Sequence, residues 1–297
     1  ALLANLTTGV SNNGLMAGSV LYLDTANSTG PVVLAGDIAD SKGPGGGAFL
    51  LKRCGAGTLQ LSGKNTYTGQ TILEGGALSV SSLNRIVNGK ASSSLGAPTD
   101  VEAGEIVLGH DGKDGDCTLI YTGPGETSDR VMNLAGKKST VTFDQSGTGL
   151  LKLTSTLVIS GYGANKTIAL TGDTAGSGEI AGNISNPHDR AGKATTAITK
   201  SGSGTWTLSG TNSYTGPTRV AGGVLACAKP TALGSGLLDI SSGARLQLNY
   251  SGTRQVTALT LNGGAAQAPG TYGSTASPAV HQNDTCFSGR GTVTVAP

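Results

Sequence analysis

Residues 57–80 read GTLQLSGKNTYTGQTILEGGALSV, and residues 204–227 read GTWTLSGTNSYTGPTRVAGGVLAC. The two segments align without a gap, so that Gly57 corresponds to Gly204 and Asn65 to Asn212. Repeated units of this length usually stack on one another. The repeat therefore predicts a solenoid, a kind of fold that serves more often as a surface or a rod than as a pocket.

The composition indicates an ordered β-protein. Glycine accounts for 49 of the 297 residues, more than twice its ordinary share, and charged residues account for only 13%. An apolar share of 37% is too high for a disordered chain, and collagen would need glycine at every third position. Short alternating runs of Thr, Ser, Gly, Leu and Val indicate strands throughout.

The charges and the apolar runs exclude two classes of partner. The net charge is +2, and the lysines and arginines are scattered without interleaved aromatic residues, so nucleic acid is not expected as a partner. No apolar run reaches the roughly 18 residues of a membrane span. Because the chain starts at Ala1, as signal peptidase would leave it, we expect a secreted protein, extracellular or at the cell surface.

The strand and turn pattern favours parallel coils over a sandwich, because two-residue hairpin signals are scarce. Asn65 and Asn212 are expected at equivalent corners, where an Asn amide can bond backbone in a turn and tolerate a left-handed conformation. Further upstream in each copy, a lysine (Lys52 or Lys200) stands just before a Gly-x-Gly-Thr run. The pattern predicts one continuous stack over residues 1–297, duplicated over roughly 19–165 and 166–297. The clearest predicted strands are Thr58–Leu61, Thr71–Leu73, Ala77–Val80, Glu105–Leu108, Thr118–Tyr121, Thr140–Phe143 and Leu150–Leu153.

The shared string G-[TS]-G-T-[LW]-x-L-S-G-x-N-[ST]-Y-T-G-x-T-x-[LV]-x-x-G-x-L resembles the autotransporter-associated β-strand repeat, the passenger-associated repeat of bacterial surface and secreted proteins. Both copies match nearly throughout, and stretches at 94–96, 118–123 and 270–291 resemble what often accompanies the repeat. The resemblance implies a secreted, single-stranded, right-handed parallel β-helix, or β-solenoid. It implies no activity, because the repeat is a scaffold element without catalytic residues of its own.

The four cysteines do not form a metal-binding pattern, because no C-x-x-C pair and no histidine at zinc-finger spacing is present. An even number of cysteines in an exported chain suggests disulfides. Similar separations favour the pairs Cys54–Cys117 and Cys227–Cys286, although the alternative, that all four are small buried apolar residues, stays open.

No constellation of catalytic residues stands out, and we expect no enzyme, no cofactor and no metal. The acidic run His110–Asp116 lacks the spacing of a calcium loop and is expected to be a solvated turn. The histidines His110, His188 and His281 lie far apart in the sequence. The aromatic residues Trp206, Tyr67 and Tyr214 could form a strip for stacking sugars, but repeat-equivalent aromatics are more often structural.

The favoured function is an extracellular structural protein that assembles head-to-tail into filaments or surface fibres. The ends of a β-helix expose unpaired backbone, and neither end of this sequence reads as a polar cap. Copies of the chain itself are therefore the expected partners, through Leu2, Leu3 and Leu6 at one end and Val293 and Val295 at the other. The alternative is a monomeric adhesin or passenger-type binding module for surface glycans or extracellular matrix. A β-helical polysaccharide lyase or glycosidase ranks third.

Overall fold

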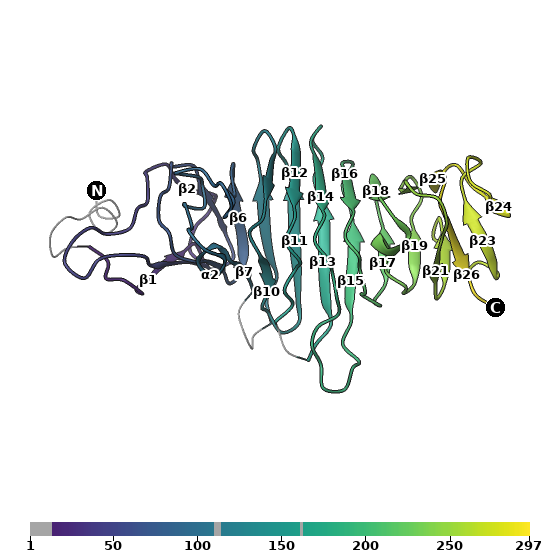
Figure 1. Cartoon of the computed structure of the whole chain (residues 1–297), viewed down its shortest axis with the longest axis horizontal. Helices are drawn as coiled ribbons and strands as arrows, with labels where there is room; N and C mark the ends of the chain where they lie inside the picture. Colours follow the sequence, from purple (N-terminus) through teal and green to yellow (C-terminus); the bar gives the residue numbers. More distant parts are fainter. Residues whose placement is uncertain (1–13, 110–113, 161–162) are drawn as a thin grey trace.

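Three parallel sheets form the faces of an elongated stack of coils, with strands that run across the long axis (Figure 1). The computed structural model describes residues 14–109, 114–160 and 163–297. The chain alternates between sheets 1 and 2 over residues 20–121, reaches sheet 3 at residues 126–128 and sheet 1 once more at residues 132–134, and then alternates between sheets 2 and 3 as far as residue 248. The predicted all-β fold of stacked parallel strands is confirmed.

Each sheet pairs strands that are one coil apart in the sequence, and every strand pair within the three sheets is parallel. Sheet 1 contains β1 (Val20–Asp24), β3 (Leu50–Cys54), β5 (Thr71–Leu73), β7 (Ile106–Leu108) and β10 (Met132–Leu134). Sheet 2 contains β2 (Val32–Leu34), β4 (Thr58–Leu61), β6 (Gly76–Val80), β8 (Cys117–Tyr121), β11 (Ser139–Gln145), β13 (Lys166–Thr171), β15 (Thr196–Lys200), β17 (Thr218–Val220), β19 (Leu238–Ile240) and β22 (Leu259–Leu261). Sheet 3 contains β9 (Glu126–Ser128), β12 (Leu150–Leu153), β14 (Ser177–Ile180), β16 (Thr205–Leu208), β18 (Val224–Cys227), β20 (Arg245–Leu248) and β25 (Phe287–Gly289).

The strands form where apolar and polar residues alternate, because successive side chains of a strand point to opposite faces of the sheet. In β11, Val141 and Phe143 are buried inside the stack, whereas Thr140 and Thr142 face outward and are half-buried. The seven strands predicted most clearly are all present. Three have the predicted bounds, and the others differ by one or two residues at an end.

The two copies of the repeat lie in one stack, but on different faces of it. In the first copy, β4 and β6 belong to sheet 2 and β5 belongs to sheet 1. In the second copy, the equivalent strands β16 and β18 belong to sheet 3 and β17 belongs to sheet 2. The second copy is therefore rotated by one face around the axis. Sheets 2 and 3 both direct apolar side chains into the interior, so the repeat can begin with a strand of either sheet.

The repeated asparagines bond backbone groups, and these groups belong to the neighbouring coils. The side-chain oxygen of Asn65 accepts from the N–H of Ile38 at 2.9 Å, and its amide donates to the carbonyl of Ser94 at 2.7 Å. Asn212 is bonded in the same way between the coils that precede and follow it. Asn65 and Asn212 are both buried.

Buried cations satisfy backbone carbonyls at the glycine-rich corners. The ammonium group of Lys200, which is fully buried, donates to the carbonyls of Gly202 at 2.9 Å and Gly222 at 3.1 Å. The equivalent residue in the first copy is Arg53, also fully buried, which donates to the carbonyls of Gly55 and Gly57. The expected equivalence of Lys52 and Lys200 is therefore wrong by one position. Lys52 lies on the outer face of β3.

The C-terminal end of the stack is covered by a small fourth sheet. It contains β21 (Thr253–Val256), β26 (Thr292–Val295), β23 (Gly270–Gly273) and β24 (His281–Gln282). The strand β26 lies between β21 and β23, with which it pairs in parallel and antiparallel orientation respectively. Val293 and Val295 are buried there and cannot be the exposed contact that the sequence predicts. Leu2, Leu3 and Leu6 lie outside the described residues.

All four cysteines are free thiols, so the two predicted disulfides are absent. Cys54 points outward from β3 in sheet 1, whereas Cys117 points inward from β8 in sheet 2, two coils further along. Cys227 and Cys286 are also separated by two coils, on either side of β20. Two coil spacings of about 4.8 Å each already exceed the roughly 7 Å between Cα atoms that a disulfide can span.

Candidate functional site

The outer face of sheet 1 differs from the outer faces of the other two sheets. Strand register places its outward side chains in columns along the stack. One column contains Val20 and Leu50, and the next contains Tyr22, Lys52 and Ile72. The second column continues through Val107 on β7 and Asn133 on β10. We call this surface the sheet-1 face.

The sheet-1 face exposes apolar surface that a β-helix does not need to expose. Tyr22 is 58% exposed and Val20 is 38% exposed, and Leu50, Ile72 and Val107 are half-buried. Residues with such side chains are uncommon on the solvent side of a sheet with one buried face, where polar residues alternate with apolar ones. Contiguous apolar surface of this kind is typical of an interaction site.

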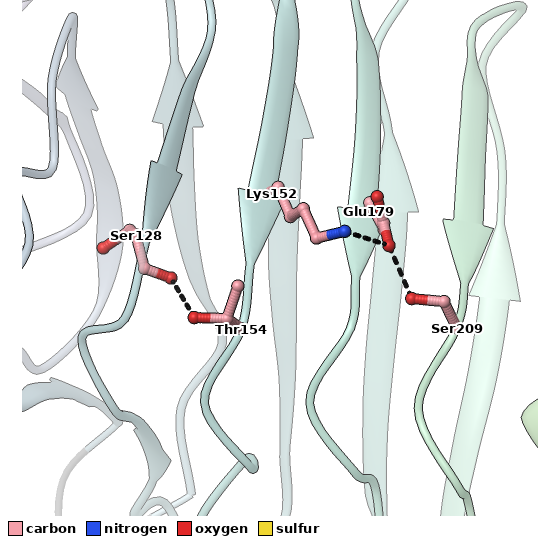
Figure 2. A network of polar contacts seen from close by, with 5 residues as sticks. All are labelled: Ser128, Lys152, Thr154, Glu179 and Ser209. Carbon is pink, nitrogen blue, oxygen red and sulfur yellow. Dashed lines mark hydrogen bonds and ion pairs between the residues drawn. The ribbon is translucent and has the colours of Figure 1, made fainter.

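The outer faces of sheets 2 and 3 carry more polar side chains in their central coils, although Val33 of β2 and Leu150 of β12 are 53% and 45% exposed. On sheet 2, Thr142 of β11 aligns with Ala169 and then Thr199 in the next two coils. On sheet 3, side chains of neighbouring coils bond to one another, as Figure 2 shows. Lys152 of β12 forms an ion pair with Glu179 of β14 at 2.9 Å, and Ser209 donates to the same carboxylate at 2.5 Å.

Polar contacts hold the charged residues of the sheet-1 face in place. The ammonium group of Lys52 lies 2.7 Å from the carboxylate of Glu74 and 5.1 Å from the centre of the Tyr22 ring. The hydrogen bond with Glu74 is the main reason why the pKa of Lys52 is raised above its ordinary value. The carboxylate of Glu105 accepts from Gln70 at 2.6 Å and from Asn133 at 2.8 Å.

A pocket of about 280 Å³ lies at the edge of this face, beside the short helix α2 (Val101–Gly104). Asp100 caps α2, because its side chain accepts from the N–H of Ala103 at 2.8 Å. The pocket lining combines apolar side chains with two carboxylates. Its lining residues are Leu50, Gly69, Gln70, Asp100, Glu102 and Ala103.

Sequence reasoning missed the sheet-1 face, although a comparison of the two repeat copies could have found it. Ile72 in the first copy corresponds to Arg219 in the second, at the outward position of β5 and β17. Arg219 is exposed and lies 3.4 Å from Asp239. The repeat therefore does not require an apolar residue at this position. Ile72 is therefore a feature of the sheet-1 face and not a requirement of the repeat.

The aromatic residues that could have formed a sugar-stacking strip are structural, as favoured. Trp206 is 1% exposed, and Tyr67 and Tyr214 are fully buried. The hydroxyl groups of Tyr67 and Tyr214 pair with Thr71 and Thr218, respectively, each at 2.8 Å. Burial raises the pKa of both tyrosines to about 12.

The polar candidates from the sequence do not come together. His188 and His281 are exposed residues of different coils, and His110 lies outside the described residues. Of the acidic run, Asp114 and Asp116 accept from backbone N–H groups one coil later, at Lys138 and Thr140. In the described parts of the chain, no group of three or more His, Cys, Asp or Glu side chains could hold a metal ion. Within the same residues, no helix is long and apolar enough to cross a membrane.

Comparisons with known proteins agree with the fold and the repeat. The passenger-associated-transport-repeat family matches residues 55–80 and 198–226, the two segments that align in the sequence. A curated protein, the adhesin BmaC autotransporter of Brucella suis biovar 1 (strain 1330), is 34% identical over 161 residues, which are 54% of this chain and 4% of that protein. No solved structure matches. The chain is therefore a stack of parallel β-coils, two segments of which are similar to the passenger-associated-transport repeat.

Proposed function

We propose that this chain is a binding segment of a bacterial surface adhesin, secreted or displayed at the cell surface, and that it has no enzymatic role. Its stacked sheets form a rod, and the sheet-1 face is the surface that meets the ligand. The similarity to an adhesin supports the class of function. The observation that carries the proposal is the exposed apolar and aromatic surface of Val20 and Tyr22 on a face that the scaffold could make polar.

Adhesion of coated beads tests this proposal. Fluorescent beads coated with the purified chain would be incubated with cultured epithelial cells and with immobilised extracellular matrix. We expect the double substitution Val20→Ser/Tyr22→Ser to reduce bead binding at least fivefold. The control is Val280→Ser, which removes a valine that is 77% exposed at the C-terminal end. Equal binding by the double variant and the intact chain would contradict the proposal.

Axial self-assembly is the second candidate function, and one observation favours it. The strands β1 and β2 are the end strands of sheets 1 and 2 in the described part of the chain, so they can accept another strand. The buried Val293 and Val295 weaken this proposal at the other end. Sedimentation velocity over a hundredfold range of concentration decides it, because a filament former would show species that grow with concentration.

A further inference from the structure

The sheet-1 face is acidic as well as apolar, and this charge indicates what kind of partner it fits. Its charged residues are one lysine, Lys52, and five acids. The acids are Asp24, Glu74, Asp100, Glu102 and Glu105. The chain as a whole carries a net charge of +2, so this local excess of carboxylates does not reflect the composition.

The single cation of this face does not neutralise the pocket. Lys52 pairs with Glu74, whose column lies on the far side of the Tyr22 column from the pocket. Glu105 is engaged by Gln70 and Asn133. Glu102 is exposed, and its side chain makes no hydrogen bond or ion pair with the described residues. One oxygen of Asp100 caps α2, and the other accepts from the hydroxyl of Thr99 at 3.5 Å.

The shape and the lining of the pocket match a long basic side chain. A lysine or arginine has an apolar stem and a charged head, and it lays the stem along apolar surface. Leu50 and Ala103 offer such surface, and Asp100 and Glu102 contribute carboxylates to the same lining. Hydrogen bonds between a cationic head and carboxylates are shorter and stronger than neutral ones. A volume of about 280 Å³ is sufficient for one such side chain.

We propose that the pocket binds the side chain of an arginine or lysine in an extended segment of a protein partner that lies across the sheet-1 face. Side chains two positions away from the basic residue point the same way and reach Val20, Tyr22 and Ile72. The basic residue sets the register, and the apolar residues exclude water around it. This inference rests on the proposed function and names the partner class of the same face.

A peptide series tests the inference directly. Three fluorescein-labelled hexapeptides have the sequence X-Ser-Val-Ser-Leu-Ser, where X is arginine, glutamine or glutamate, and binding is measured by fluorescence anisotropy. We expect the arginine peptide to bind at least tenfold more tightly than the glutamine peptide, and the glutamate peptide to bind most weakly. The double variant Asp100→Asn/Glu102→Gln should abolish this preference. It leaves the fold intact, because an asparagine at position 100 still caps α2.

The control variant is Glu179→Gln, which removes one carboxylate from the polar face of sheet 3 and should leave the peptide preference unchanged. Equal affinity for the arginine and glutamine peptides would overturn the inference. So would a dimer at high concentration that Val20→Ser/Tyr22→Ser dissociates, because the partner would then be a second copy. If bead adhesion depends on Tyr22 but not on Asp100 and Glu102, the inference fails and the proposed function stands. If adhesion does not depend on Val20 and Tyr22, the proposed function itself fails.

Discussion

Substitution of Asn212 tests how the repeat stabilises neighbouring coils. The side chain of Asn212 is 4% exposed and bridges three coils. Its oxygen accepts from the N–H of Ile184 at 2.8 Å, and its amide donates to the carbonyl of Ala232 at 2.6 Å. In Asn212→Ala, both backbone groups lose their partner in a site that water does not reach.

A buried polar group without a partner costs about 1–3 kcal/mol, and two groups lose theirs, so we expect Asn212→Ala to lower the free energy of unfolding by about 2–6 kcal/mol. The matched control is Asn183→Ala. Asn183 also accepts an inter-coil hydrogen bond, from the N–H of Thr211 at 2.7 Å, but it is exposed. Water replaces the lost bond there, and we expect a change below about 1 kcal/mol.

Trp206, the single tryptophan, provides a local signal for this measurement, because β16 immediately precedes the Asn212 corner. Guanidinium unfolding followed by its fluorescence reports the coils around it, which matters because solenoid repeats can unfold separately. Equal midpoints for Asn212→Ala and Asn183→Ala would refute the reasoning.

The variant Asn212→Asp adds a pH dependence of known sign. The new carboxylate can accept from Ile184, but it faces the carbonyl of Ala232 without a proton to donate. Burial raises the pKa of such a carboxyl in the folded state, so folding takes up a proton and stability increases as the pH falls. We expect Asn212→Asp to gain stability relative to Asn212→Ala between pH 7 and pH 5. No gain in this range would contradict the assigned donor and acceptor.

Three further predictions concern the interior. Gly178→Ala places a Cβ 2.4 Å from the ring of Trp206, so we expect a loss of about 1–3 kcal/mol and a changed fluorescence spectrum, whereas Gly30→Ala, with no atom within 4 Å, should have little effect. Burial lowers the pKa of Lys200 to about 8, so between pH 8 and 10 the unfolded chain binds more protons than the folded chain. The free energy of unfolding of the intact protein should therefore increase as the pH rises from 8 to 10, relative to that of Lys200→Met, when both are measured by urea titration. Thiol titration of the unfolded, unreduced protein should find four free thiols, and in the folded protein Cys54 should react first because the other three are buried.

The strands were predictable from the sequence because alternation is a local property. The bounds of β4, β5 and β12 follow from runs such as TLQL and LLKL, whose apolar residues face the interior. The stacking was also predictable, since a repeated segment that buries one side must pack on a neighbour. The inter-coil role of Asn65 was not, because its partners, Ile38 and Ser94, lie 27 and 29 residues away and carry no signal of their own.

The positions of the faces could not be predicted, because they depend on the lengths of the coils. Thr58 pairs with Ala77, 19 residues later, whereas Gly76 pairs with Cys117, 41 residues later. Long surface excursions add little to the cost of closing a coil, so the sequence tolerates both lengths. The predicted disulfides failed for a different reason: the cysteines of each pair are two coils apart, which is farther than a disulfide can span.

The rotation of the second copy separates the residues that build the scaffold from those that make its surface. Leu61, Asn65 and Tyr67 recur as Leu208, Asn212 and Tyr214, and all six are buried although the copies occupy different faces. These residues are therefore determined by packing in the buried interior, which both copies share. Some outward positions differ between the copies, as Ile72 and Arg219 do, whereas others, such as Thr58 and its counterpart Thr205, are identical. The outward positions at which the copies differ are therefore those that the repeat itself leaves free to vary.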